Sequence, residues 1–197
     1  MREPDLKRAI TFIDGQNLFH AARAAFGHKH PNYDVVTLSE AVCRAHNWSL
    51  RQVRFYTGVP DLRDDARWHT FWSKKLSVMG KMGVAIYSRP LRYRNRVVLL
   101  PGGIEYSFRA GEEKGIDVRI SLDAIRHAMH DRFDVGVIFS QDQDFSEVAE
   151  EIRAITGGQS PSQTALVRPP WFSEPDEGKS VTEQRITEQS WRDASQN

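Results

Sequence analysis

The chain has 197 residues, which is enough for one domain with a sizeable core. Its 27 Lys and Arg residues against 26 Asp and Glu give a net charge of +1, so overall charge neither favours nor excludes a nucleic-acid partner. The single cysteine, Cys43, excludes an intramolecular disulfide framework and fits a reducing, cytoplasmic setting. The N-terminal residues lack the apolar core of a signal peptide, and no apolar run approaches the ~20 residues that span a bilayer. We therefore expect no membrane association.

Strand-like and helix-like patterns alternate along the first 156 residues. Short apolar runs predict core strands at residues 9–13, 52–57, 83–87 and 135–139. Amphipathic patterns predict helices at residues 16–26, 35–46, 64–82, 118–130 and 145–155. Strands separated by helices imply right-handed crossovers and a parallel sheet with helices on both faces. We expect Cys43 to be half-buried on its helix, and His127 and His130 to be solvated or close to a helix end.

A different pattern interrupts this alternation between residues 88 and 114. Residues typical of β-strands flank Pro101, Gly102 and Gly103, which predicts a β-hairpin arm projecting from the sheet. Aromatic residues alternate there with five arginines: Arg89, Arg92, Arg94, Arg96 and Arg109. These arginines either follow a phosphate backbone while tyrosines stack on bases, or they form only the solvated faces of a hairpin.

The composition changes again after residue 156. Residues 157–197 are rich in Gly, Pro, Ser and Gln, and residues 164–167 are one further candidate strand. Beyond residue 169 we expect little packed structure. The chain is therefore predicted to comprise one domain at residues 1–156 and a divergent, poorly ordered C-terminal segment at residues 157–197.

Acidic residues recur where predicted strands end and where one helix begins. Asp14 ends the first strand, Asp142 and Asp144 follow the strand at residues 135–139, and Asp117 opens the helix after the arm. Ligands of open α/β sheets bind at the carboxyl ends of the strands, so these carboxylates can meet at one edge. Carboxylate oxygens suit Mg²⁺, which polarises phosphoryl oxygens and activates water.

Each acid also has a structural explanation. Asp14 is a turn residue or a helix N-cap, and Asp117 can cap its helix. Asp144 lies three residues before Glu147, as in a capping box, whereas Asp142 precedes the cap and favours a functional role. Asp123 is either a solvated position or a partner that supports the metal ligands.

Three segments together resemble the motifs of a known family. FIDGQN at residues 12–17, EKGIDV at 113–118 and SQDQDF at 140–145 resemble the three motifs of the NYN domain family, which comprises PIN-like, LabA-type proteins. The resemblance spans roughly residues 8–156. It implies an α/β, PIN-like three-layer fold, with a central, mostly parallel sheet of about five strands flanked by helices. The basic β-hairpin arm would be attached to that fold.

The resemblance also implies a site and a reaction. Relatives are regarded as ribonucleases that use Mg²⁺ or Mn²⁺ at the motif acids, which by position implies the metal ligands Asp14, Asp117 and Asp142. Asp144 would be a further ligand or lie behind the ligands, and Asn17 would orient substrate or water. These five residues form the predicted catalytic set. The predicted substrate-binding residues are Lys114, Ser140, Arg92, Arg94 and Arg96.

The leading hypothesis is therefore a metal-dependent endoribonuclease whose partner is RNA. One alternative is a non-catalytic nucleic-acid-binding module that keeps the same fold. The other is a phosphohydrolase for small phosphoesters, although Asp14-Gly15-Gln16 lacks the D-x-D pattern of a dehalogenase-type nucleophile. The oligomeric state stays open, with a homodimer as one option.

Overall fold

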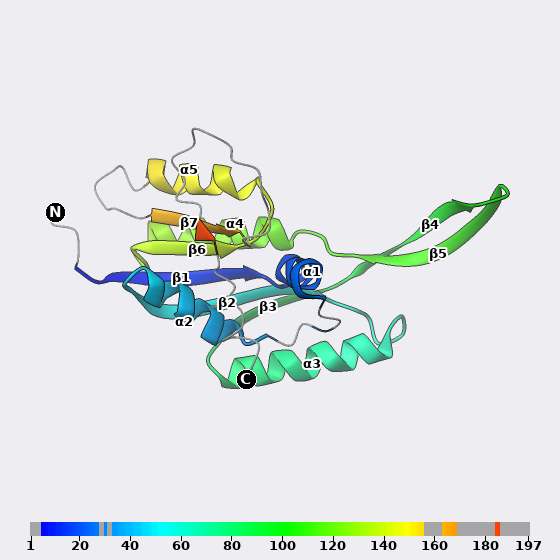
Figure 1. Ribbon diagram of the computed structural model, residues 1–197, viewed down its shortest axis with the longest axis horizontal. Coiled ribbons are helices and arrows are strands. Elements are labelled where there is room, and N and C mark those ends of the chain that lie inside the picture. Colours follow the sequence, from blue (N-terminus) through cyan, green and yellow to red (C-terminus); the bar gives the residue numbers. More distant parts are fainter. Residues whose placement is uncertain (1–4, 28–29, 31–32, 156–162, 169–183, 186–197) are drawn as a thin grey trace.

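The computed structural model describes residues 5–27, 30, 33–155, 163–168 and 184–185. Its centre is a sheet with the strand order β3-β2-β1-β6-β7-β8 (Figure 1), in which every pairing is parallel. The strands are β1 (Lys7–Asp14), β2 (Trp48–Val59), β3 (Ala85–Pro90), β6 (Val135–Phe139), β7 (Gln163–Arg168) and β8 (Gln184–Arg185). The predicted α/β fold with a parallel sheet is confirmed, and the candidate strand at residues 164–167 lies within β7.

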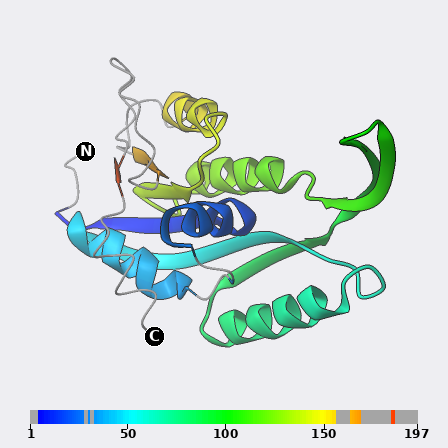
Figure 2. The ribbon, with the colours of Figure 1, turned by 45° about the vertical axis from the view of Figure 1, so that its right-hand side comes forward.

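Helices cover both faces of the sheet, which makes three layers (Figure 2). One face carries α1 (Gly15–Phe26), α2 (Val35–Ala45) and α3 (Ala66–Lys81), and the other carries α4 (Ile116–Met129) and α5 (Phe145–Ile155). Each face has its own apolar core, with alternate residues of β1 and β6 contributing to one or the other. β6 is buried along its whole length because both of its faces are covered.

The strand order reverses between β1 and β6. From β1 the chain builds outward through β2 to β3, and it then returns to add β6 and β7 on the other side. In parallel α/β sheets such a reversal leaves a crevice at the carboxyl ends of the two central strands, where ligands bind. The fold therefore predicts a ligand site at the carboxyl ends of β1 and β6.

Local signals account for several helix boundaries. The Asp34 carboxylate accepts the backbone N–H of Val36 at 2.8 Å and begins α2, and that of Asp65 accepts Trp68 N–H at 3.0 Å and begins α3. One expectation was wrong: Cys43 is fully buried rather than half-buried, because its face of α2 packs into the core. Burial raises the pKa of its thiol to about 11.

The predicted arm is a two-stranded antiparallel hairpin that projects from the body of the protein (Figure 1). Its strands are β4 (Arg92–Leu100) and β5 (Ile104–Glu112), joined by a turn with Gly102 and Gly103 at positive φ. Arg89 does not belong to the arm, because it lies in β3 of the central sheet.

No helix within the described ranges is long and apolar enough to cross a membrane. Residues 156–162, 169–183 and 186–197 lie outside the described residues, so the predicted division of the chain at residue 156 stays a prediction.

Candidate active site

Asp14 lies at the point where the strand order reverses. It is the last residue of β1 and the N-cap of α1, and its carboxylate accepts the backbone N–H of Asn17 at 2.9 Å. The residue is only 8% exposed. Burial, reinforced by the negative charges of Asp117 and Asp142, raises its pKa to about 6 despite the helix N–H groups that it accepts. The predicted cap is thus present, and it coexists with a perturbed acid at the sheet edge.

Gly15 fixes how closely α1 approaches the sheet. A Cβ at this position would lie 2.4 Å from Cζ of Phe55 and 2.9 Å from the carbonyl oxygen of Tyr56. Two residues further on, Oδ1 of Asn17 accepts the backbone N–H of Gln141 at 2.8 Å. The first turn of α1 is therefore tied both to β2 and to the segment after β6, and Asn17 positions that segment.

The SQDQDF segment turns sharply after β6. Oγ of Ser140 accepts the backbone N–H of Asp142 at 3.2 Å, and the Asp142 carboxylate accepts that of Asp144 at 3.0 Å. The capping box expected for Asp144 is wrong, since within the described part of the chain no N–H group donates to its carboxylate. The segment thus uses Ser140 to shape the turn and leaves Asp144 exposed.

Asp117 lies in the first turn of α4. The N-cap of this helix is Gly115, which adopts φ 75°, so the alternative that Asp117 caps the helix is wrong. A negative charge in a first turn is stabilised by the helix macrodipole. Asp117 and the preceding Lys114 are both exposed. The sheet edge thus receives an exposed acid from α4 beside the buried acid of β1.

Glu113 is a further acid at this edge, and it was not predicted from the sequence. Its carboxylate accepts the backbone N–H of Gly58, at the end of β2. Burial, followed by the charges of Asp14 and Asp117, raises its pKa to about 7. Glu113 is the first residue of the EKGIDV segment, and this position directly before Lys114 was the signal that could have pointed to it.

The donor chemistry of this edge suits a divalent cation. The negative charges of Asp117 and Asp142 act on Asp14, and those of Asp14 and Asp117 act on Glu113. Carboxylates this close to one another favour a neutralising metal ion. Within the described residues, however, no group of three or more His, Cys, Asp and Glu side chains is gathered tightly enough to hold a metal ion. The arrangement fits Mg²⁺ or Mn²⁺ bound through one or two carboxylates that keeps several waters.

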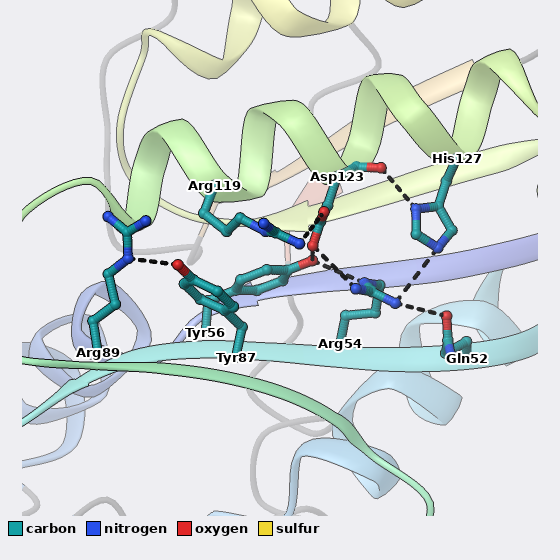
Figure 3. A network of polar contacts seen from close by, with 8 residues as sticks. All are labelled: Gln52, Arg54, Tyr56, Tyr87, Arg89, Arg119, Asp123 and His127. Atoms are coloured by element: carbon teal, nitrogen blue, oxygen red, sulfur yellow. Dashed lines mark hydrogen bonds and ion pairs between the residues drawn. The ribbon is translucent and has the colours of Figure 1, made fainter.

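Asp123 is a buried residue on the side of α4 that faces the sheet, at the centre of a polar network (Figure 3). Its Oδ2 accepts Arg54 Nη2 at 3.0 Å and Tyr56 Oη at 2.9 Å, and its Oδ1 accepts Arg119 Nη2 at 3.0 Å. Burial alone would raise its pKa, but the hydrogen bonds from Tyr56, Arg119 and Arg54 hold that pKa below its ordinary value. The alternative of a solvated Asp123 is wrong, because the helix face that carries it packs against β2.

His127 belongs to the same network. It lies in the last turn of α4, as one of the two expectations stated, but it is half-buried rather than solvated. Its Nδ1 lies 2.7 Å from the carbonyl oxygen of Asp123, and its ring meets that of Phe12 edge-on at 6.0 Å. Burial lowers its pKa, which favours the neutral ring. His130 is exposed, as expected for a residue at a helix end.

Three of the four arginines of the arm lie on one face, and Arg109, which is paired with Asn95, lies on the other. The register pairs Arg96 with Phe108 and Val98 with Tyr106, so Arg92, Arg94 and Arg96 share a face with these two aromatic rings. Arg94 and Arg96 both form ion pairs with Glu112, whereas none is recorded for Arg92 among the described residues. The distal half of the arm is apolar and exposed, a feature absent from the sequence prediction: Val97, Val98, Leu99, Leu100 and Ile104.

The fold and the acidic edge define the class of the protein as a PIN-like, nuclease-type α/β domain. The model of the NYN domain matches residues 8–158, and the chain belongs to the NYN domain family. A comparison with curated proteins gives no match.

Two solved structures are similar to different degrees. The crystal structure of a protein of unknown function from Vibrio parahaemolyticus has a TM-score of 0.53 at 18% identity and covers 99% of this chain and 93% of its own. That likeness concerns the fold alone. Ribokinase from Giardia lamblia has a TM-score of 0.37 at 13% identity, with 63% of this chain and 37% of that chain covered. This similarity is too weak to indicate a shared fold or function.

Proposed function

We propose that the protein is a metal-dependent endoribonuclease that hydrolyses RNA phosphodiester bonds at the acidic edge around Asp14. The observation that carries this proposal is Asp14 itself, a buried carboxylate at the strand-order reversal whose pKa is raised to about 6. A buried acid with acidic neighbours lowers the stability of the folded protein, and such destabilising arrangements are typical of catalytic sites. Membership of a nuclease-type family supports hydrolysis of a phosphodiester.

Asp14, Asp117 and Asp142 would supply the carboxylates for a Mg²⁺ or Mn²⁺ ion, one or two of them binding it directly and the remainder through its water molecules. Asp144 and Glu113 would lie close to it. A bound ion would neutralise charge on the phosphoryl group and lower the pKa of a water molecule. The chain contributes the positioning. Asn17 holds the segment after β6 through Gln141 N–H, and Ser140 turns that segment so that Asp142 follows the strand end.

RNA is the substrate class that the arm supports. Its charged face combines three arginines with the stacked rings of Tyr106 and Phe108, whose centroids are 6.2 Å apart. Aromatic rings stack on unpaired bases, and guanidinium groups contact phosphates, so this face suits a single strand. Lys114, at the base of the arm beside Asp117, would lie between the arm and the acids.

The test is cleavage of RNA by the purified protein with Mn²⁺, with and without a chelator. Asp14→Asn is the site variant, and Asp131→Asn, an exposed aspartate in the turn after α4, is the matched control. We expect cleavage by the wild type and by the control, and none with chelator or with Asp14→Asn.

Two other results would each favour one of the alternative functions. RNA binding without cleavage under any metal condition would favour the non-catalytic module. Hydrolysis of a small phosphoester such as p-nitrophenyl phosphate, with RNA left intact, would favour the phosphohydrolase.

A further inference from the structure

A second polar site lies under α4, away from the acidic edge. It is a cavity of about 310 Å³ around Asp123, whose other lining residues are Arg54, Arg119, Arg126, Arg132, His127 and His130. The α4 residues recur at helical spacing along one face, and Arg54 reaches the cavity from β2 (Figure 3). Arg119, the cavity residue nearest to Asp117, is two residues beyond it and therefore about 200° around the helix, so the two sites lie on different faces of α4.

The cavity has an excess of positive charge. Four guanidinium groups face one carboxylate, which leaves a formal charge of +3 when the two histidines are not counted. Asp123 is already shared by Arg54 and Arg119. Arg126 and Arg132 are exposed, and neither forms an ion pair within the described part of the chain.

Hydrogen-bond donors are also in excess. A guanidinium group has five N–H donors and no acceptor, and its charge persists at any physiological pH. Nε of Arg119 is buried and has no hydrogen-bond partner among the described residues. The guanidinium of Arg119 lies 4.7 Å from the ring centroid of Tyr87, which holds it against the sheet. The wall of the cavity thus presents more donors than the protein itself satisfies.

We propose that this cavity binds the phosphate group of an anionic ligand. Guanidinium groups match the tetrahedral oxygens of phosphate in bidentate pairs, and a concave site surrounded by arginines concentrates anions. The outer pair, Arg126 and Arg132, contacts the phosphate, while Asp123 holds Arg54 and Arg119 in place behind it. The phosphate belongs either to the backbone of a bound nucleic-acid strand or to a free phosphate-bearing molecule. The proposal goes beyond the proposed nuclease, since it requires no acid of the catalytic edge.

The test uses the full-length protein in a chelating buffer, with inorganic phosphate as the first probe. The site variant is Arg126→Ala with Arg132→Ala, both exposed positions outside the core. The control is Arg44→Ala with Arg67→Ala, which removes the same charge from the opposite face of the sheet. Arginine Nε–Hε signals in NMR spectra report binding, and circular dichroism checks the fold.

We expect phosphate to shift the signals of Arg119 and its neighbours in the wild type and in the control. The site variant should bind about tenfold more weakly or worse, because each lost charge-assisted hydrogen bond is worth roughly tenfold. Replacing the same two arginines with Lys should give an intermediate affinity, since the charge stays but the bidentate geometry is lost.

A single-stranded RNA oligonucleotide then distinguishes the two sources of phosphate. If RNA displaces phosphate from the cavity, the ligand is a backbone phosphate; if phosphate binds and RNA does not compete, the ligand is a free phosphate-bearing molecule. Absence of shifts with phosphate, or equal weakening in the site and control variants, would overturn the proposal. Asp14→Asn should bind phosphate like the wild type, so failure of this site and failure of the nuclease assignment are separable.

Discussion

Replacing Asp123 with Ala should lower the free energy of unfolding by about 3 kcal/mol. The carboxylate is 5% exposed and accepts three hydrogen bonds, two of them from arginines whose side chains are 18% and 37% exposed. Without it, Arg54 and Arg119 face each other across a buried space, and Tyr56 loses the acceptor of its hydroxyl.

The magnitude follows from the burial of the partners. Removing one partner of a buried ion pair costs about 3–5 kcal/mol, because the remaining charge stays desolvated. Water can reach the partly exposed Arg119, which places the loss at about the lower end of that range. In a domain of 150–250 residues each kcal/mol corresponds to roughly 2–4 °C, so the melting temperature should fall by about 6–12 °C.

Chemical denaturation followed by far-ultraviolet circular dichroism near pH 7.5 measures this loss. Asp131→Asn is the control, because Asp131 pairs with Arg8 at 3.0 Å but is 74% exposed and Asn tolerates its φ of 48°, so the loss should stay below about 1 kcal/mol. Because the pKa of Asp123 is lowered in the folded state, its contribution is present above its unfolded pKa of about 3.9 and is lost as the pH falls further. Equal, small losses in both variants at neutral pH would refute the reasoning.

Three further predictions concern the acidic edge and the arm. Asp14→Asn should stabilise the metal-free protein by about 2–3 kcal/mol at pH 8 but not at pH 4. The folded pKa of Asp14 is raised to about 6, so ionising this acid costs stability as the pH rises above about 4. Identical denaturant midpoints for variant and wild type at pH 8 would contradict this. Asp142→Asn should abolish Mn²⁺-dependent RNA cleavage while leaving the fold intact, and Asp144→Asn should be milder because Asp144 is the more exposed of the two; the reverse order in a cleavage assay would exchange their roles. Replacing Arg92, Arg94 and Arg96 of the arm with Ala should weaken RNA binding and flatten its salt dependence without slowing turnover of bound RNA. Of the three, Arg92 should have the largest single effect, because the other two share Glu112. An unchanged salt slope in a binding titration would show that the arm does not contact phosphates.

Local patterns of the sequence predict much of the fold. The apolar runs of β1 and β6 and the amphipathic stripe of α3, with Trp72 and Met79 buried, depend only on residues a few positions apart. The motif acids are also local signals, since Asp14 ends one strand and Asp142 comes three residues after another, and the carboxyl ends of these strands must share an edge in a parallel sheet. These features were predictable because secondary structure and strand direction set them.

The sites that depend on distant partners were not predictable in this way. Glu113 joins the acidic edge only because β2 brings Gly58 N–H to it, and Asp123 is buried rather than solvated because β2 presents Arg54 and Tyr56 beneath α4. The basic cavity likewise combines Arg54 with residues 65 or more positions later in the chain. No local period relates such residues, so their charges, pKa values and partners depend on which elements the tertiary packing brings into contact.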